Sequence, residues 1–515
     1  MNKYALISVS DKTGIEYLAV ELEKMGYTIL STSYTADYLK QFCQKVVLVS
    51  DLTKFPEILE GRVKTLHPVI YAGILADRNN PAHAKTLSEL KIEHIDVIAV
   101  NLYPFASVCR KENATEQEII ENIDIGGPAL IRAGAKNYKS VTVLVDPVDY
   151  APALELLKQS SILPEKFSSY LAQKAFAKTR DYDAEIAAYF ASQGKEESIT
   201  YELPAQLEFS ISLKRKLRYG ENPHQNGGFY TNVNPGWELI HGKELSFNNI
   251  MDMDSAFRAI RLFAKPTAII IKHCNPCGIG SGETLAEAYR KAYETDTEAP
   301  FGGIVIVNRP LDLETATLIN NIFTEIIIAP AFEPNVLEFL KKKKNRRLIH
   351  YEFSLLEKPL NPVEIKTLTC GYLAQDWDLV NESTENWKIV TNKQPAPEEL
   401  EAIIYAWKAV SVLKSNAIAI AKKDGVLGLG CGQTSRIDAV QLALWKAKKF
   451  GHDLMDSVCA SDGFFPFRDC IDTLAKNGIS AIIQPGGSKN DEECISACNE
   501  LNIAMVFTGV RHFKH

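Results

Sequence analysis

The fold is decided by residues 4–49, which read YALISVSDKTGIEYLAVELEKMGYTILSTSYTADYLKQFCQKVVLV. Short apolar runs alternate here with segments in which apolar residues recur at helical spacing. We expect strands at 4–9, 28–30 and 46–49, separated by helices at 11–25 and 35–43. This alternation predicts a parallel sheet covered by helices, an architecture that binds ligands at the carboxyl ends of its strands.

Similar alternation continues along the chain. Strands at 96–100 and 140–145 extend the first sheet, and the polar stretch 192–204 is typical of a linker. Two further α/β halves follow without a residue-level repeat, joined by an irregular segment near 355–400. Their expected helices are 251–264, 285–293, 402–416 and 439–449, and their expected strand segments are 267–273, 302–308, 417–430 and 479–483. We therefore predict an α/β protein with domains at 1–195 and 203–515.

Composition excludes several classes of protein. The formal net charge of −7 over 515 residues argues against general nucleic-acid binding, which needs a basic surface. No apolar run approaches the roughly 18 residues of a membrane span, and the first residues lack the apolar core of a signal peptide. We expect a cytoplasmic protein without a membrane partner.

The ten cysteines form no regular framework, so we expect most of them to be free and buried. Cys274 and Cys277 form a C-x-x-C, and Cys494 and Cys498 lie four apart on an expected helix. One such pair supplies half of a tetrahedral zinc shell, and no partner pair has the required spacing. We predict no metal site.

The apolar run 268–271 ends in Lys272 and His273. Histidine readily takes or gives a proton near neutral pH, and an adjacent lysine can stabilise a developing negative charge. The alternative is a strand end with two solvated cations. The neighbouring polar clusters favour a catalytic role, because they supply groups for an anionic substrate.

Polar clusters recur in both parts of the chain. In the first part they are GRVKTLHP (61–68), NLYPF (101–105) and IDIGGPALIRAGAKN (123–137), together with the Ser/Thr-rich loops 8–14 and 31–36. Hydroxyl groups beside helix starts favour a phosphate; ordinary N-capping by Ser10, Asp11 and Thr35 is the alternative. In the second part they are LRYGENPHQ (217–225), KSN (414–416), GLGCGQTSRID (428–438), FFPFRD (464–469) and RHFKH (511–515).

The glycine-rich loop 428–433 has neither the G-x-G-x-x-G spacing of dinucleotide-binding proteins nor the G-K-[ST] of a P-loop. A nucleotide-dependent oxidoreductase is therefore disfavoured.

Twelve motifs carry a resemblance to a known family. They are SVSDKTG, GRVKTLHP, NLYPF, IDIGG, RAGAKN, LRYGENPHQ, KHCNPCG, FGGI, KSNAIAIAK, GQTSRID, SDGFFPFRD and TGVRHF, in family order and nearly end to end. The chain resembles the bifunctional purine-biosynthesis enzymes that combine AICAR transformylase with IMP cyclohydrolase. The resemblance implies a methylglyoxal-synthase-like parallel-sheet domain, then two cytidine-deaminase-like α/β subdomains without catalytic zinc, in a homodimer.

The resemblance also implies two reactions. The C-terminal part transfers a formyl group from the co-substrate 10-formyltetrahydrofolate to AICAR, giving FAICAR, and the N-terminal part closes FAICAR to IMP with loss of water. In the transformylase, His273 is the expected general base, and Lys272 stabilises the oxyanion or protonates the departing folate nitrogen. Asn416 is expected to orient His273 and the formyl group. The expected nucleotide-binding residues are Arg218, Tyr219, Gln433, Arg436 and Arg511, with Phe464 and Asp469 on the folate side.

In the cyclohydrolase, the resemblance makes Lys64, Tyr103, Asp124 and Lys136 the catalytic set. The expected binding residues are Ser10, Lys12, Ser31, Thr35 and Arg62. Because ring closure is unimolecular, positioning the reacting groups and polarising the formyl oxygen can suffice.

The sequence departs from the family pattern at three positions. The phosphate loop S-T-G-G-T-A has Ser33 and Tyr34 in place of its two glycines, and Tyr71 replaces a histidine. Glycine there permits a positive φ and close approach of backbone N–H groups to phosphate. Two hypotheses remain: a bifunctional enzyme with an altered cyclohydrolase site, or a transformylase whose N-terminal domain is weakened or mainly structural.

Overall fold

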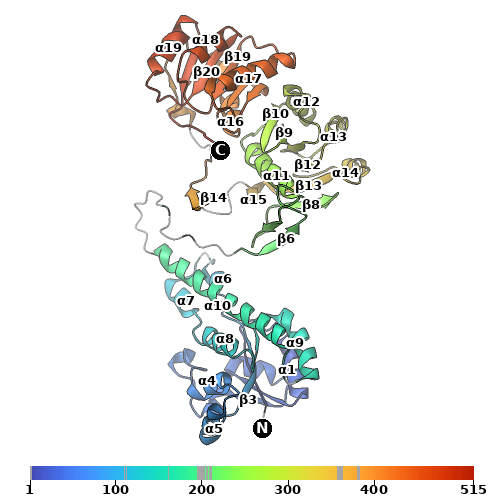
Figure 1. Ribbon diagram of the computed structural model, residues 1–515, viewed down its shortest axis with the longest axis vertical. Helices are drawn as coiled ribbons and strands as arrows, with labels where there is room; N and C mark the ends of the chain where they lie inside the picture. Colours follow the sequence, from blue (N-terminus) through green and yellow to red (C-terminus); the bar gives the residue numbers. More distant parts are fainter. Residues whose placement is uncertain are drawn as a thin grey trace. The chain divides into compact units, whose positions relative to one another are not determined.

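The computed structural model describes residues 3–109, 111, 113–160, 162–193, 203, 207, 211–356, 363–379 and 383–515. Two compact units divide the chain, Met1–Glu202 and Leu203–His515 (Figure 1). Most of the predicted linker at 192–204 lies outside the described residues. Among the described residues, no helix combines the length and apolar character needed to cross a membrane.

Within its described part, the first unit contains a five-stranded parallel sheet in the order β3-β2-β1-β4-β5, as predicted. Its strands are β1 (Lys3–Ser8), β2 (Tyr27–Ser31), β3 (Val46–Leu48), β4 (Ile95–Val100) and β5 (Thr142–Leu144). The carboxyl ends of β1 and β4 lead into the loops at 8–14 and 101–104, and β2 leads through Thr32 directly into α2, so the predicted loop at 31–36 is wrong for residues 33–36. Three polar segments that are far apart in sequence are thus collected at one sheet edge.

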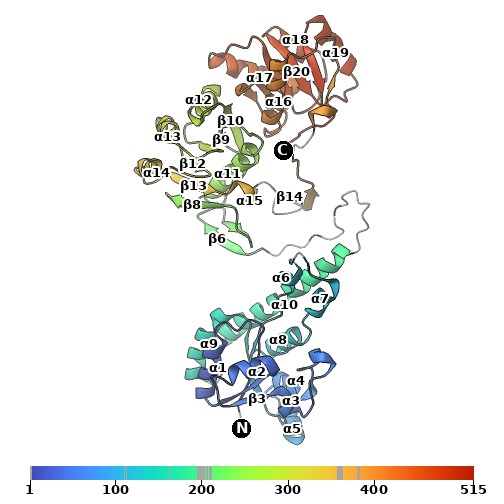
Figure 2. The same cartoon turned by 180° about the vertical axis from the view of Figure 1, so that it is seen from behind.

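Helices cover this sheet. They are α1 (Ile15–Lys24), α2 (Ser33–Leu39), α3 (Val49–Thr53), α4 (Pro68–Leu75), α5 (Pro81–Leu90), α6 (Phe105–Cys109), α7 (Glu116–Glu121), α8 (Gly126–Lys136), α9 (Tyr150–Gln159) and α10 (Glu165–Gln193), with short 3₁₀ turns η1 (Leu59–Gly61) and η2 (Pro147–Asp149). Helix α1 lies beside α9 in both views (Figures 1 and 2), and α8 packs against α4 and α10. Neither α1 nor α2 has a side-chain N-cap, because their cap positions are Gly14 and Thr32 without such a bond; the capping alternative for Ser10, Asp11 and Thr35 is therefore wrong.

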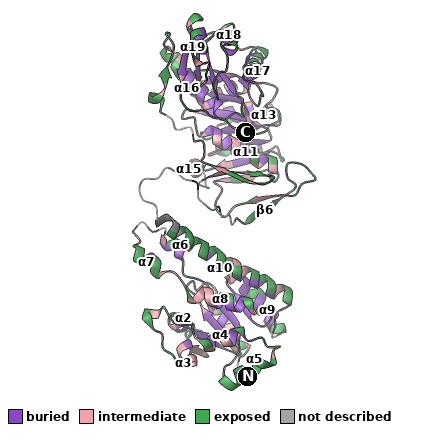
Figure 3. Cartoon of the chain, turned by 60° about the vertical axis from the view of Figure 1, so that its left-hand side comes forward, coloured by how far each residue is buried: buried purple, intermediate pink, exposed green. Residues whose placement is uncertain are grey.

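The second unit is built on one mixed sheet, ordered β16-β21-β20-β19-β17-β18-β10-β9-β11-β12-β13-β8 within the described residues. The strands are β8 (Trp237–His241), β9 (Thr267–Lys272), β10 (Asn275–Ser281), β11 (Ile304–Val307), β12 (Ile326–Ala329), β13 (Arg347–Tyr351), β16 (Lys388–Ile389), β17 (Ile418–Lys422), β18 (Gly425–Gly430), β19 (Ser457–Ser461), β20 (Ile479–Gln484) and β21 (Ala504–Phe507). The central strands are buried beneath the partly exposed helices (Figure 3), while the edge strands β8 and β16 remain partly exposed.

The unit consists of two halves with the same order of elements. A helix, a β-hairpin and three helix–strand pairs occur in each, and the halves meet where β10 pairs with β18. The helices are α11 (Phe247–Ile260), α12 (Leu285–Thr295), α13 (Leu313–Asn320) and α14 (Pro334–Lys341) in the first half, and α16 (Pro397–Val410), α17 (Arg436–Lys449), α18 (Asp469–Ala475) and α19 (Asp491–Glu500) in the second. The predicted pair of α/β halves is confirmed.

A residue-level repeat does exist, contrary to expectation. GIGSGET (278–284) and GLGCGQT (428–434) occupy equivalent places, and their first three residues lie in β10 and β18. A Cβ on Gly278 would lie 1.8 Å from the Ala292 oxygen, and one on Gly430 would lie 2.0 Å from the Ala439 oxygen. These glycines let α12 and α17 pack directly on the strands. The predicted glycine-rich loop at 428–433 is therefore wrong for residues 428–430, which form a strand.

Smaller elements complete this unit. They are the hairpins β6 (Leu213–Leu217) with β7 (Gly227–Tyr230) and β14 (Glu364–Leu368) with β15 (Gly371–Gln375), the helix α15 (Phe353–Leu356) and the turn η3 (Thr384–Asn386). The irregular segment near 355–400 thus contains a hairpin, a 3₁₀ turn and the edge strand β16, while 357–362 and 380–382 lie outside the described residues.

Candidate active sites

The Lys272–His273 pair lies at the tip of the β9–β10 hairpin. Lys272 pairs with Asn275, and the two residues between them, His273 and Cys274, have φ values of 53° and 60°. A two-residue hairpin turn with both φ values positive matches the right-handed twist of the strands, but it is normally built from Gly or Asn. The backbone at His273 is therefore held in a conformation that is unfavourable for its side chain, a feature that concentrates at functional sites.

Hydrogen bonds fix both sides of this turn. The Cys274 N–H donates to Asp252 Oδ1 at 2.7 Å, and Lys272 Nζ donates to the carbonyls of Ala299 and Phe301 at 3.2 and 2.9 Å. The His273 side chain is exposed to solvent at the tip. The turn thus presents a free imidazole beside an anchored ammonium group.

The second half of the unit reaches this hairpin through Asn275, whose Oδ1 accepts from the Lys414 N–H at 3.1 Å. Two residues further on, both ends of the Asn416 amide are held. Its Nδ2 donates to the Gln433 carbonyl at 2.9 Å, and its Oδ1 accepts from Arg436 Nη2 at 2.7 Å. The structure therefore brings together the predicted site residues Asn416, Gln433 and Arg436, and it fixes the orientation of the Asn416 side-chain amide.

The Arg436 guanidinium binds other groups of the protein and is buried. Its Nη1 donates to the Ala417 carbonyl at 3.0 Å and pairs with Asp462, and both charged side chains are buried. The Asp462 carboxylate also accepts from the Ala417 N–H at 3.0 Å and from the Ser415 hydroxyl. Sequence analysis missed Asp462 and Ser415, although SDG directly precedes the FFPFRD motif and Ser415 lies within KSN.

Other predicted substrate residues of this unit lie in open positions. The Arg218 guanidinium lies 5.7 Å from the Tyr219 ring, and the Arg511 guanidinium lies 4.6 Å from the Phe513 ring. Phe464 is 41 % exposed, and Asp469 begins α18 and accepts the Cys470 N–H at 2.8 Å. Because Gly463 has no side chain, the Arg436 guanidinium and the Phe513 ring both pack closely against it. A Cβ there would lie 2.7 Å from Arg436 Nη2 and 2.6 Å from the Phe513 ring.

The cysteines of the two close pairs are free. Burial raises the pKa of Cys277 to about 12 and that of Cys498 to about 12, which keeps both as thiols at neutral pH. Among the described residues, no group of three or more His, Cys, Asp or Glu side chains is placed to hold a metal ion.

In the first unit, Asp124 lies just before α8. Burial raises the pKa of its carboxyl group, while the N–H groups of Gly127 and Tyr103 and the nearby Lys64 charge oppose the rise. The Gly127 N–H donates to Asp124 Oδ1 at 2.7 Å, and a Cβ on Gly127 would lie 2.6 Å from Asp124 Oδ2. This close approach explains Gly127, and Gly126 is required because a Cβ there would lie 2.9 Å from Thr65 Oγ1.

Lys64 lies between an acidic and an aromatic side chain. Its Nζ is 3.9 Å from Glu57 Oε2 and 5.7 Å from the centre of the Tyr34 ring. Tyr103 is 45 % exposed, and Lys136, the last residue of α8, is also exposed. The structure thus places Lys64 close enough to Asp124 for their charges to attract each other, and the Tyr103 backbone N–H donates to the Asp124 carboxylate.

The expected phosphate-binding residues form a network at the carboxyl ends of β1 and β2. Lys12 Nζ contacts the Val9 carbonyl and lies 3.0 Å from Thr35 Oγ1, which donates to the same carbonyl. The Ser31 hydroxyl donates to the Ile7 carbonyl at 2.6 Å. These contacts join the two loops and leave Lys12 as their shared cation.

Three further positions complete the first-unit site. The Ser10 N–H donates to Asn101 Oδ1 at 2.6 Å, which ties the first loop to the end of β4. Arg62 is exposed and pairs with Glu121, at 3.2 Å from Nε to Oε1. Burial and the Asp124 charge raise the pKa of Tyr71 to about 12, and its hydroxyl group has no hydrogen-bond partner within the described part of the chain.

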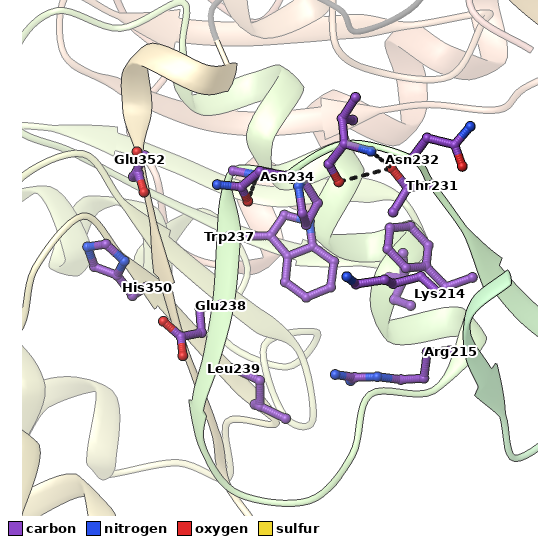
Figure 4. A pocket seen from close by; sticks show the side chains of 15 residues that line it. Lys214, Arg215, Thr231, Asn232, Asn234, Trp237, Glu238, Leu239, His350 and Glu352 are labelled. Carbon is purple, nitrogen blue, oxygen red and sulfur yellow. Dashed lines mark hydrogen bonds between the residues drawn. The ribbon is translucent and has the colours of Figure 1, made fainter. Parts of the chain in front are cut away.

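A cavity of about 710 Å³ lies elsewhere in the second unit, between the β6–β7 hairpin and β8 (Figure 4). Lys214, Arg215, Trp237, His350 and Glu352 are among its lining residues, and it includes none of the residues predicted to act in catalysis. The catalytic candidates instead lie on the hairpin tip and the strand-end loops.

Comparisons with known proteins identify the family of this chain. Residues 14–129 match the model of the MGS-like domain, and residues 134–446 match that of the AICARFT/IMPCHase bienzyme. Three relatives carry the name bifunctional purine biosynthesis protein PurH. They come from Acetivibrio thermocellus (48 % identical), Caldicellulosiruptor saccharolyticus (46 %) and Enterococcus faecalis (46 %), and each alignment covers all of both chains. The chain therefore belongs to the AICARFT/IMPCHase bienzyme family.

Proposed function

We propose that the two activities of this family are divided between the units, with formyl transfer at the β9–β10 hairpin tip and ring closure at the strand ends around Asp124. The protein is an AICAR transformylase and IMP cyclohydrolase of purine biosynthesis. The left-handed turn at His273, held by Lys272 and Asp252, is the observation that carries the assignment of formyl transfer.

In formyl transfer, the 5-amino nitrogen of AICAR attacks the formyl carbon of 10-formyltetrahydrofolate. His273 takes the proton that the amine loses as the new C–N bond forms. Lys272 has three N–H bonds, and two of them are directed to backbone carbonyls. The third remains for the oxyanion or for the folate nitrogen that leaves with a proton.

Asn416 has a matching role. Its Oδ1 and one hydrogen of its Nδ2 are already bonded, so the second Nδ2 hydrogen is available to the substrate. Arg436 acts through Asn416, because its guanidinium is engaged by Asp462 and the Ala417 carbonyl. Gln433, Arg218, Tyr219 and Arg511 complete the nucleotide side of the proposed site, with Phe464 and Asp469 toward the folate.

In ring closure, the carboxamide nitrogen of FAICAR attacks its formyl carbon, and water leaves after proton transfer. Asp124 is suited to exchange that proton because burial raises the pKa of its carboxyl group above the ordinary value. Lys64, Tyr103 and Lys136 would polarise the formyl oxygen. The network of Ser10, Lys12, Ser31 and Thr35, with Arg62 nearby, would receive the phosphate group.

The partners follow from the same proposal. They are AICAR, FAICAR, IMP and the formyl-folate, without nucleic acid or membrane, and with no metal required for catalysis. A cytoplasmic location agrees with soluble folate and nucleotide substrates. We infer a homodimer from the family resemblance.

An assay of the full chain that follows FAICAR and IMP separately tests the division of labour. Asn416→Ala should reduce FAICAR formation by roughly a hundredfold, since it removes an oriented hydrogen-bond donor from the reacting centre, and should leave IMP formation from supplied FAICAR unchanged. Asp124→Asn should have the opposite pattern. Each activity is the control for the other variant, and loss of both activities in either variant would contradict separate sites.

A further inference from the structure

Ser33 and Tyr34, which stand where the family loop has two glycines, both contact the surroundings of Lys64. The Ser33 hydroxyl donates to Glu57 Oε1 at 2.6 Å, and the Ser33 N–H donates to the same oxygen at 3.3 Å. The second carboxylate oxygen of Glu57 lies 3.9 Å from Lys64 Nζ, with the Tyr34 ring 5.7 Å from that nitrogen. A glycine at position 33 could make only the backbone bond.

We propose that Glu57 is a positioning residue for ring closure: Ser33 fixes its carboxylate, and the carboxylate holds the Lys64 ammonium at the site. The inference rests on the role proposed for Lys64. On this proposal Ser33 serves Lys64 through Glu57 and does not bind the phosphate, because the N–H and the hydroxyl group of Ser33 both donate to the Glu57 carboxylate. Phosphate is then left to the network centred on Lys12.

The local packing supports a restrained Lys64. A Cβ on Gly61 would lie 2.7 Å from Lys64 Cε and 3.2 Å from Nζ, so the η1 turn closes against the lysine side chain. The side chains of Lys64 and Glu57 are 21 % and 28 % exposed, which weakens screening of their attraction. A long, flexible lysine loses much of its rotamer freedom in such surroundings, and this order is what a positioning group supplies.

Five variants of the full chain test the proposal, with IMP formation from FAICAR as the readout. Glu57→Gln keeps an acceptor for Ser33 and removes the charge facing Lys64, so kcat should fall roughly tenfold with KM within about twofold. Ser33→Ala keeps the Glu57 charge but removes the hydroxyl group that fixes its carboxylate, so kcat should fall by roughly threefold. The double variant should resemble Glu57→Gln alone, because both changes break one chain of contacts.

Glu60→Gln is the matched control, since it removes the same charge from the same short segment, and its kcat should stay at the wild-type value. Glu57→Asp should recover part of the rate lost in Glu57→Gln. Formyl transfer to AICAR should be unchanged in every variant, which shows that the second unit is intact, and circular dichroism with a thermal melt should show that the first unit remains folded.

The outcomes separate three cases. If Glu57→Gln matches Glu60→Gln while the wild-type chain forms IMP, Glu57 does not position Lys64. If Ser33→Ala and Glu57→Gln raise KM to the same extent and leave kcat unchanged, Glu57 merely anchors the loop and the proposal fails. A wild-type chain that forms no IMP from FAICAR would instead overturn the proposed function itself.

Discussion

The two hairpins of the second unit have the same backbone plan and different consequences. β9–β10 turns at His273 and Cys274, and β17–β18 turns at Lys423 and Asp424, with Lys272 and Lys422 at equivalent strand ends. Only the first turn has positive φ values at both positions. In the second, Asp424 Oδ2 lies 2.7 Å from Lys291 Nζ and the Asp424 carbonyl accepts from the Ser281 N–H. The first tip carries an exposed imidazole, and the second forms an ion pair with the other half.

This contrast teaches that the repeat specifies the scaffold and the turn residues specify the role. The glycines of GIGSGET and GLGCGQT are equivalent because both halves need a helix packed directly on a strand. The turn residues are free of that constraint. One turn could therefore acquire a histidine in a strained conformation while the other acquired an ion pair.

The largest expected difference between the tips is in catalysis. Lys272→Ala should lower the rate of formyl transfer by roughly 10²–10³-fold, as loss of an oxyanion donor does. Lys422→Ala, the equivalent change on the exposed second strand end, should leave the rate within twofold. Steady-state kinetics with AICAR and 10-formyltetrahydrofolate measure both, and equal losses would remove the functional contrast between the hairpins.

The next largest expected effect is a loss of stability on substitution of the glycines that both halves share. Gly278→Ala and Gly428→Ala, at equivalent positions of the repeat, should each destabilise the second unit by roughly 1–3 kcal/mol or more, because the new methyl group would collide with the carbonyl of a packed helix. Gly371→Ala, at a site with open space around the Cβ position, is the control. Calorimetry of the full chain compares the three, and a stable Gly428 variant beside an unstable Gly278 variant would show that the halves are packed differently.

The smallest effect is that of the ion pair at the second tip. Asp424→Asn should cost about 1 kcal/mol at pH 8, since Lys291 keeps its contacts with Glu287 and the Ser281 carbonyl. Burial alone would lower the pKa of Lys291, but its hydrogen bonds to Asp424 and Glu287 outweigh burial and raise it.

Because the pKa of Lys291 is higher in the folded chain than its ordinary value of 10.5, the pair stabilises the fold below that pH and ceases to do so as the pH rises through the folded value. Denaturant unfolding at pH 8 and near pH 11 should therefore show a difference between wild type and variant that shrinks at the higher pH. A constant difference would mean that Asp424 acts by another route.

The sequence was sufficient for the first sheet, where strands of three to six mostly apolar residues alternate with periodic helices and turn signals. It was insufficient for β10 and the end of β18. Pro276 and the repeated glycines are poor strand formers by propensity, and here tertiary packing of α12 and α17 outweighs that preference.

The candidate sites show a similar division. Motifs identified Lys272, His273, Asn416, Lys64 and Asp124, because chemistry restricts residue type at those positions. Asp462 and Glu57 were missed, since a carboxylate that holds another side chain is defined by its partner in space. Arg436 has the spacing of a substrate ligand, yet its guanidinium faces a buried carboxylate.

The central claim is that the first hairpin tip is catalytic and the second is structural. It is tested most directly by measuring formyl transfer to AICAR in His273→Ala and Lys423→Ala under the same conditions. We predict that His273→Ala loses about a thousandfold in rate, in the range for a missing general base, while retaining IMP formation from FAICAR, and that Lys423→Ala keeps both activities. A His273→Ala enzyme that transfers the formyl group at a rate close to that of Lys423→Ala would contradict the account.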